Sequence, residues 1–363
     1  MADVVTVDAS FWRGRRVLLT GHTGFKGSWL GLWLQDMDAA VSGISCGIPT
    51  EPSLYTLARV GEAMADEAVI DVRDHPALAG AVARMAPEVI VHMAAQPLVR
   101  RSFADPRETF ETNVMGTVNV LEAARSTASL RAIVVVTSDK CYENRGWEWG
   151  YREDEAMGGH DPYSSSKGAA ELVTAAYRRS FFSDPHGPAV ASARAGNVIG
   201  GGDWGPDRLI PDLVRAATEG CTLEIRNPAA VRPWQHVVNP LAGYLVLAQT
   251  LWSSPQVAGG WNFGPPEEDA RPVSWVVERM RDRWAGRPAW KPDPGPHPHE
   301  AHYLKLDSSR ARERLGWRPL VTLEEALDSI VAWYRELEAG ADMRAVTLAQ
   351  LQWLTAGAGA GAA

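Results

Sequence analysis

Tyr163 and Lys167 are four residues apart in the segment YSSSK, and this spacing places both side chains on one face of a helix. An ammonium group beside a phenol favours the phenolate, so we expect Lys167 to lower the pKa of Tyr163 toward neutrality. A phenolate of this kind can accept the proton of a sugar hydroxyl while the carbon that carries the hydroxyl loses hydride. The pair therefore predicts oxidation of an alcohol.

Ser138, Asp139 and Lys140 follow the apolar run at 132–136, which is typical of a buried parallel strand. Open α/β sheets bind their ligands outside the carboxyl ends of such strands. An acid and a possible base beside a redox phenol indicate elimination in addition to oxidation. The alternative is an ordinary ion pair between the adjacent Asp139 and Lys140.

The composition is that of a globular enzyme. The chain has 363 residues, of which 45% are hydrophobic and 22% charged, and a formal net charge of −8. The acidic balance argues against nucleic acid as a partner. Cys46, Cys141 and Cys221 are dispersed and form no CxxC pair, so neither a disulfide framework nor a metal site is indicated. The amino-terminal segment does not resemble a signal peptide, and no apolar stretch approaches the roughly 20 residues of a membrane helix. We therefore expect a cytoplasmic protein that does not bind membranes.

The order of the elements predicts an α/β fold with a Rossmann-type doubly wound parallel sheet. Short β-branched runs alternate with helical patterns in the first half of the chain, which indicates βαβ units. Strands are expected at 16–20, 41–45, 68–71, 89–92, 132–137 and 189–193, and helices at 24–35, 106–125 and 163–181. Beyond residue 196 the sequence becomes rich in Gly, Pro and Trp, with helices expected at 207–219, 240–252, 272–284 and 323–338. We expect a cofactor-binding domain at 1–195, a smaller mixed α/β substrate lobe at 196–355 with segments that return to the first domain, and a disordered tail at 356–363.

The segment TGHTGFKG at 20–27 lies between an expected strand and an expected helix. Gly21, Gly24 and Gly27 would provide the tight turn, the close approach to a pyrophosphate and the close helix packing of a dinucleotide site. An acidic residue that could bind the ribose 2′-hydroxyl is missing at the end of the second strand, which leaves NADP as an alternative to NAD. Asp71 is suited to the adenine amino group, and the alternative role for it is a helix cap before Pro76.

Several segments resemble the extended short-chain dehydrogenase/reductase superfamily: TGHTGFKG, HMAAQ at 92–96, TNVMGT at 112–117 and YSSSK at 163–167. Further segments resemble the nucleotide-sugar 4,6-dehydratases within it: TSDKCYEN at 137–144, RAGNVIGGGDW at 194–204, DRLIPD at 207–212, RPWQHV at 232–237 and HEAHYLKLD at 299–307. Dehydratases of dTDP- or GDP-sugars carry an Asp-Glu pair where this chain has Asp139 and Lys140. The lysine is similar to the members that act on CDP-glucose.

This resemblance implies NAD as cofactor and CDP-glucose as substrate, with a 4-keto-6-deoxy sugar as product for deoxysugar biosynthesis such as that of lipopolysaccharide O-antigen. It implies that Tyr163 takes the proton of the C4 hydroxyl with Ser138 as hydrogen-bond partner and Lys167 as support. Lys140 would remove the C5 proton, and Asp139 would give a proton to the departing C6 hydroxyl.

The resemblance also implies the remaining site residues. Cofactor contacts are expected from Gly21, Thr23, Gly24, Phe25, Lys26, Gly27, Asp71, Val72, His92, Ala94, Ala95, Asn113, Tyr163 and Lys167. Substrate contacts are expected from Gln96, Asn197, Arg208, Arg232 and His302. We expect Asn113 to brace the helix and a proton-relay water near Lys167. Structural alternatives stay open for several of these residues: a buried histidine for His92, a simple buried amide in a helix for Asn113, and solvated surface positions for the two arginines.

Two rival functions share parts of this pattern. A nucleotide-sugar epimerase would use the same glycine-rich loop and the same Tyr163 and Lys167, but it has no use for Asp139 and Lys140 as an elimination pair. A Rossmann-type binding protein without catalysis would be expected to lack Tyr163 or Lys167. The superfamily commonly dimerises through two long helices, so we expect a homodimer with a four-helix interface formed by 106–125 and 163–181.

Overall fold

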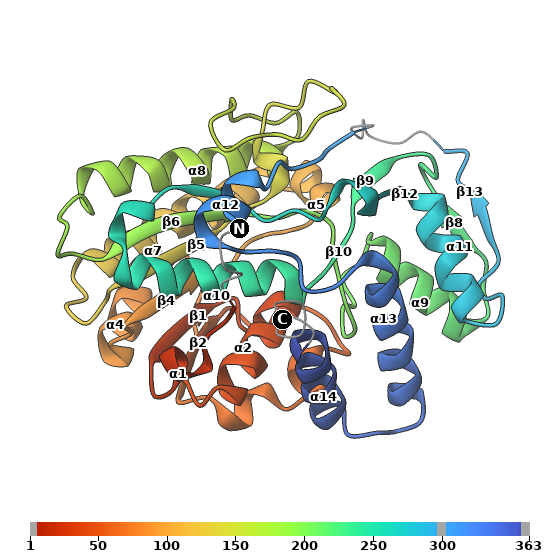
Figure 1. Ribbon diagram of the computed structural model, residues 1–363, viewed down its shortest axis with the longest axis horizontal. Helices are drawn as coiled ribbons and strands as arrows, with labels where there is room; N and C mark the ends of the chain where they lie inside the picture. The colour runs from red at the N-terminus through yellow and green to blue at the C-terminus, as the bar shows by residue number, and fades with distance from the viewer. Residues whose placement is uncertain (1–5, 296–302, 357–363) are drawn as a thin grey trace.

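A seven-stranded parallel sheet forms the centre of the molecule, which is described by a computed structural model for residues 6–295 and 303–356 (Figure 1). The strands are β1 (Arg16–Thr20), β2 (Ala40–Ser45), β3 (Asp66–Val69), β4 (Val89–His92), β5 (Ala132–Val136), β6 (Ala189–Arg194) and β11 (Gly260–Asn262). Their order across the sheet is β3-β2-β1-β4-β5-β6-β11, and every neighbouring pair is parallel. The order reverses between β1 and β4, where open α/β sheets bind ligands.

Alternate side chains of the strands enter two different cores. Leu19 of β1 packs in the core that contains α2 (Phe25–Asp36) and α10 (Val238–Ser253). Its neighbour Leu18 packs in the core that contains α4 (His75–Met85) and α7 (Gly116–Arg125). Because successive side chains of a strand point to opposite faces, helices cover both sides of the sheet. The predicted Rossmann-type doubly wound fold is confirmed.

The segment predicted as one helix at 106–125 has a π-helical turn in its middle. It consists of α6 (Pro106–Phe110), the π turn η2 (Glu111–Met115) and α7. Asp105 accepts the Glu108 amide and caps the first turn. A single π turn inside a helix frequently marks a functional region, and this turn carries Asn113. The other long helix of this face, α8 (Pro162–Ser180), packs against α6, η2 and α7.

Three short two-stranded sheets and three helices form a smaller lobe beside the central sheet (Figure 1). The strand pairs are β7 (Val198–Ile199) with β10 (Gln235–His236), β8 (Leu223–Ile225) with β13 (Trp290–Pro292), and β9 (Val231–Pro233) with β12 (Ala270–Pro272). The helices are α9 (Leu209–Glu219), α11 (Val273–Arg283) and α13 (Leu323–Glu338). All four helices predicted after residue 196 are present within two residues of their expected ends. Two later segments return to the first domain, because β11 pairs with β6 and α10 packs against β5 and β6.

The remaining elements are short or lie near the carboxyl terminus. They are α1 (Ala9–Trp12), α3 (Leu54–Leu57), η1 (Val60–Ala63), α5 (Val99–Ala104), η3 (Asp139–Cys141), η4 (Pro255–Val257), η5 (Glu267–Asp269), α12 (Ser309–Leu315) and α14 (Met343–Ala356). Ala356 ends α14, so the tail that we expected to be disordered does not begin there, and its residues 357–363 lie outside the described part of the chain. Across residues 6–295 and 303–356, no helix has the length and apolar character needed to cross a membrane.

Candidate active site

A cleft of about 1220 Å³ lies at the carboxyl ends of the central strands and is closed on its other side by the smaller lobe. The residues that directly follow β1, β4, β5 and β6 all line it, namely Gly21, Met93, Thr137 and Ala195. Most of the predicted site residues line this cleft: Gly21, Thr23, Gly24, Phe25, Lys26, Gly27, Asp71, Val72, Ala94, Ala95, Gln96, Ser138, Asp139, Lys140, Tyr163, Lys167, Asn197, Arg208 and Arg232. His302 lies outside the described residues.

The glycine-rich loop has the geometry of a dinucleotide cradle. Gly21 has a φ of +74°, and a Cβ there would come within 2.8 Å of the Ala94 backbone nitrogen. At Gly27 a Cβ would overlap the carbonyl oxygen of Gly21, so only glycine lets α2 approach the loop this closely. The N-cap of α2 is Gly24, whose lack of a side-chain cap leaves the first amide groups of the helix available to an anion.

A hydrogen-bonded network that sequence reasoning missed supports the end of β2. Ser45 Oγ lies 3.0 Å from His22 Nδ1, and His22 Nε2 lies 2.7 Å from Glu67 Oε1. Burial lowers the pKa of His22, so its ring is neutral at pH 7. Tyr55 donates to the same Glu67 oxygen at 2.6 Å. Glu67 lies on β3 and does not line the cleft, so it supports the loop after β1 and does not replace the acid missing from the end of β2.

Asp71 lies in the loop after β3 and is not a helix cap. The cap of α4 is Asp74, whose carboxylate accepts the Ala77 amide at 3.1 Å. Asp71 instead accepts hydrogen bonds from the guanidinium of Arg73 at 2.6–3.0 Å, and these hydrogen bonds lower its pKa. An ionised carboxylate therefore lines the cleft at this point.

His92 and Asn113 are buried and do not contribute to the cleft wall. His92 Nδ1 lies 2.7 Å from Thr20 Oγ1 and its Nε2 lies 3.2 Å from Thr117 Oγ1, and burial lowers its pKa to about 3. Both ring nitrogens of a neutral imidazole are therefore occupied within the protein, which agrees with the structural alternative for His92.

The amide of Asn113 joins the loop after β4 to helix α8. Its Nδ2 donates to the Gln96 carbonyl at 3.1 Å and to Ser166 Oγ at 2.8 Å, and its Oδ1 accepts the Gln96 amide at 2.8 Å. Gln96 lines the cleft, but its side chain bonds to Thr109 Oγ1 and to the backbone of Leu98. The two amides therefore hold the wall of the cleft, and their polar atoms are already engaged inside the protein.

Ser138, Asp139 and Lys140 form a tight turn at the end of β5, which we call the catalytic turn (residues 138–141). Ser138 caps the 3-10 helix η3 by accepting the Lys140 amide at 3.2 Å, and its hydroxyl donates to Asp139 Oδ1 at 2.9 Å. Asp139 is buried, and no hydrogen-bond partner for its Oδ2 is found in residues 6–295 and 303–356. In the same ranges no ion pair joins Asp139 to Lys140, so the ordinary ion pair considered above is not formed.

Tyr163 and Lys167 are both on the first turns of one helix, α8, as their spacing predicted, and the structure buries both side chains. Burial raises the pKa of Tyr163 to about 12, although a hydrogen bond with Ser138 opposes this rise. Burial also lowers the pKa of Lys167 to about 8, against the negative charge of Glu171. The expectation that Lys167 brings the phenol pKa toward neutrality is therefore wrong for the protein without ligands, because burial disfavours the charged form of both groups.

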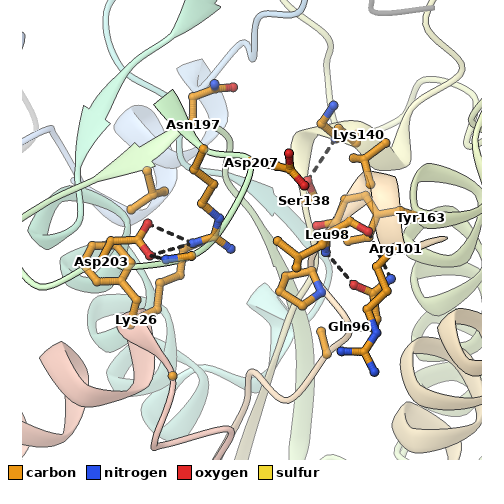
Figure 2. A pocket seen from close by; sticks show the side chains of 18 of the residues that line it. Lys26, Gln96, Leu98, Arg101, Ser138, Lys140, Tyr163, Asn197, Asp203 and Asp207 are labelled. Carbon is orange, nitrogen blue, oxygen red and sulfur yellow. Dashed lines mark hydrogen bonds and ion pairs between the residues drawn. The ribbon is translucent and has the colours of Figure 1, made fainter. Parts of the chain in front are cut away.

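The wall opposite Tyr163 is rich in charge. Figure 2 shows Lys26 and Asp203 on one side of the cleft and Ser138, Lys140 and Tyr163 on the other. Burial lowers the pKa of Lys26 to about 8, and the positive charges of Arg208 and Lys167 add to this effect. Arg208 donates to both oxygens of Asp203 at 2.9 and 3.2 Å, which fixes its guanidinium at the cleft.

Two further predicted substrate contacts lie in the lobe half of the cleft. Asn197 has a φ of +41° just before β7, and Arg232 lies on β9. Together with Arg208 and Lys26 they surround the cleft with donors suited to a diphosphate. The arrangement can therefore bind two phosphate-containing molecules side by side, move a proton from a hydroxyl, and offer an acid and an amine for elimination.

Comparisons with known proteins show similarity to nucleotide-sugar 4,6-dehydratases, which agrees with this combination of groups. Residues 18–330 match the family model described as GDP-mannose 4,6 dehydratase. The chain is 52% identical over 342 residues to a CDP-glucose 4,6-dehydratase of Salmonella typhimurium, covering 93% of this chain and 95% of that protein. It is 26% identical to a dTDP-glucose 4,6-dehydratase of Neisseria gonorrhoeae, covering 88% of this chain and 95% of that protein.

Solved structures share the fold. The dTDP-glucose 4,6-dehydratase of Streptomyces venezuelae, solved with NAD bound, superimposes with a TM-score of 0.77 at 25% identity and covers 90% of this chain and 99% of its own. A UDP-glucose 4-epimerase of Stenotrophomonas maltophila gives a TM-score of 0.78 at 21% identity, with 90% of this chain and 99% of its own covered. The likeness to the epimerase concerns the fold alone.

Proposed function

The chain belongs to the GDP-mannose 4,6 dehydratase family, and on this basis we propose that it converts CDP-glucose to CDP-4-keto-6-deoxyglucose with loss of water. The observation that carries the proposal is that the catalytic turn, with its acid and amine, shares one cleft with Tyr163 and Lys167. Oxidation alone needs only the phenol and its lysine. The identity of 52% with a CDP-glucose 4,6-dehydratase supports CDP-glucose over other nucleotide sugars.

We propose NAD as the resident cofactor, held by the glycine-rich loop and by the residues that follow β2 and β3. Gly21 and Gly27 let the loop pack closely against the Ala94 backbone and α2, the uncapped start of α2 fits a pyrophosphate, and the ionised Asp71 fits an adenine amino group. The cleft-lining segment 45–50 carries no basic side chain that would bind the 2′-phosphate of NADP. When bound, NAD accepts a hydride from C4 of the sugar and returns a hydride to C6.

The oxidation half of the reaction would depend on Tyr163. Its phenolate accepts the proton of the C4 hydroxyl. The side chain of Ser138 forms a hydrogen bond with Tyr163 and so lies beside the same sugar hydroxyl. Burial favours the neutral phenol, so the site must supply positive charge when the reaction begins. Lys167, with a pKa of about 8, is mostly protonated at pH 7 and can supply that charge.

The elimination half would depend on Asp139 and Lys140. A ketone at C4 makes the proton at C5 acidic, and Lys140 accepts this proton. The C6 hydroxyl leaves as water with a proton from Asp139. Asp139 lines the cleft, its Oδ1 accepts the Ser138 hydroxyl, and its Oδ2 has no hydrogen-bond partner in the described ranges. When hydride returns to C6, a proton has to return to C5, and Lys140 gives it back. The proton that Tyr163 takes from the C4 hydroxyl then equals the proton that Asp139 gives to the departing water, so protons are conserved.

Incubation with CDP-, dTDP-, GDP- and UDP-glucose tests the function. We expect loss of one water from CDP-glucose, seen by mass spectrometry, and the strong alkaline absorbance of a 4-keto-6-deoxy sugar. Retention of mass with inversion at C4 would identify an epimerase. Faster loss of water from another nucleotide sugar would keep the dehydratase but change its substrate.

We propose that the protein is a homodimer that pairs through α6–α7 and α8. Large apolar side chains are exposed on this face: Phe103 on α5, Phe110 on α6, Met115 on η2, and Leu172 and Phe181 on or next to α8. Leu172 is 61% exposed. Several large apolar side chains exposed on neighbouring helices support an interface between protein chains here.

We also propose the division of the chain into a cofactor domain at 1–195 and a mainly substrate-binding lobe at 196–355. The three small sheets of the lobe support it, since none of their strands joins the central sheet. A cytoplasmic location is proposed because Cys46, Cys141 and Cys221 are free thiols and the substrates are nucleotides. The product would enter deoxysugar biosynthesis, of which lipopolysaccharide O-antigen formation is one route.

A further inference from the structure

Glu171 and Arg194 form an ion pair that is buried away from the cleft. Glu171 Oε2 lies 2.8 Å from Arg194 Nη2, and each side chain is 4% exposed. Neither residue lines the cleft, so neither is placed to touch a bound ligand. A buried ion pair loses hydration on both sides and contributes little stability by itself. Its hydrogen bonds to neighbouring residues indicate a more specific role.

Glu171 holds the start of the catalytic turn. Thr137, which directly precedes Ser138, donates from Oγ1 to Glu171 Oε1 at 2.5 Å. Ser192 on β6 donates to the other oxygen, Oε2, at 2.6 Å. Glu171 also lies one turn after Lys167 on α8, so its carboxylate both holds the residue before the catalytic turn and acts electrostatically on the lysine.

Arg194 holds the end of the catalytic turn. Its Nη1 donates to Tyr142 Oη at 2.6 Å, and Tyr142 directly follows the turn. The same nitrogen donates to the Glu153 carbonyl at 3.0 Å, and Tyr142 Oη donates to Asn262 Oδ1 at 2.7 Å. One ion pair therefore fixes both ends of the catalytic turn, through Thr137 on one side and Tyr142 on the other.

We propose that Glu171 and Arg194 are positioning residues that act as a clamp on the catalytic turn, and that they set the geometry of Ser138, Asp139 and Lys140 relative to Tyr163. This inference rests on the proposed dehydratase function. Small displacements of reacting groups reduce rates strongly, whereas they have little effect on the binding of a large nucleotide ligand. Loosening the clamp is therefore expected to lower kcat with little change in KM.

The experiment removes one hydrogen bond of the clamp at a time and keeps both charges paired. Thr137→Val releases the start of the turn, and Tyr142→Phe releases its end. Ser192→Ala is the matched control, because Ser192 donates to the same carboxylate as Thr137 but lies on β6, away from the turn. For each variant, kcat and KM for CDP-glucose, the rate of deuterium washout from C5, and the stability to urea are measured.

We expect Thr137→Val and Tyr142→Phe to lower kcat and C5 washout by roughly 10- to 100-fold, with KM within about threefold of wild type. Ser192→Ala should stay within about threefold in kcat despite a similar loss of hydrogen bonding. Equal effects of all three variants, in proportion to their loss of stability, would show that the ion pair serves folding alone and would overturn the proposal. If the wild-type protein removes no water from CDP-glucose, the proposed function fails instead, and the two failures are distinct.

Discussion

Gly196 lies directly against the carboxylate of Asp139, and a Cβ at residue 196 would overlap Oδ2. The segment after β6 therefore has to be glycine at this point for the acid to occupy its position. A larger residue would displace either the backbone of the cleft wall or the carboxylate itself.

Gly196→Ala is expected to reduce dehydration of CDP-glucose by about 10- to 100-fold, because a displaced acid cannot protonate the departing hydroxyl efficiently. Binding of CDP-glucose, measured by calorimetry, should change much less. Gly80→Ala is the matched control, since no atom lies within 4 Å of a Cβ at that helical position. Full activity of the Gly196 variant would show that Asp139 is not held by this contact.

Tyr163→Phe is expected to lower turnover by about 10²- to 10⁴-fold, because the lost hydroxyl moves a proton and does not grip the nucleotide. The affinity for CDP-glucose should survive. Tyr177→Phe on the same helix is the control, because its hydroxyl bonds to Glu122 outside the cleft. Turnover of the Tyr163 variant within tenfold of wild type would remove this residue from the proton transfer.

Lys140→Met separates elimination from oxidation. Water loss should fall by about 10²- to 10⁴-fold, the usual effect of removing a general base, while the site for the C4 hydroxyl stays intact. The measurement is a single-turnover reaction of C5-deuterated CDP-glucose, followed for deuterium washout and for loss of water. Asp139→Asn should retain washout but lose elimination. Normal washout in the Lys140 variant would place the base elsewhere, with Tyr163 as the next candidate.

Lys167→Met is expected to abolish activity but to stabilise the fold near neutral pH. The pKa of Lys167 falls from its ordinary 10.5 to about 8 because the amine is buried, which corresponds to about 3 kcal/mol of instability at pH 7. Between pH 8 and 10.5 the unfolded chain binds more protons than the folded chain. The free energy of unfolding of wild type therefore rises with pH through this window and approaches that of the variant.

Urea unfolding at pH 7 and pH 9.5 checks this sign. The free energy of unfolding of Lys167→Met should exceed that of wild type by up to about 3 kcal/mol at pH 7, and the difference should be smaller at pH 9.5. Lys291→Met, at an exposed position of β13, should show no such change with pH. A variant less stable than wild type at pH 7 would mean that the pairing of Lys167 outweighs the cost of its burial.

Leu172→Glu tests the proposed dimer. Burying an unpaired carboxylate in an apolar interface is costly, so the variant should be monomeric at concentrations at which wild type is dimeric. Light scattering measures both masses. Trp353→Glu is the control, because Trp353 is similarly exposed at 57% but lies on α14, on the other face of the sheet. A wild-type mass equal to that of one chain at micromolar concentration would contradict the dimer.

Patterns of short range in the sequence were enough to predict much of this protein. The glycine-rich loop, the apolar run before Ser138 and the spacing of Tyr163 and Lys167 each depend on a few neighbouring residues, and local backbone geometry follows from them directly. The parallel sheet, the long helices and the shared cleft of the catalytic turn and Tyr163 were predicted for this reason. The π turn at 111–115 was missed, since nothing in its local pattern differs from that of an α-helix.

Only the tertiary structure decided the pKa values and the hydrogen-bond partners of the individual side chains. Tyr163 and Lys167 have the predicted spacing, but burial determines their pKa values, and burial comes from segments far apart in the chain. The partners of His92, on β1 and α7, and the link from Glu67 through His22 to Ser45 likewise join elements that are far apart in the chain. Desolvation and hydrogen bonding depend on which atoms meet in space, whereas sequence spacing reports only what lies within one strand or one helix.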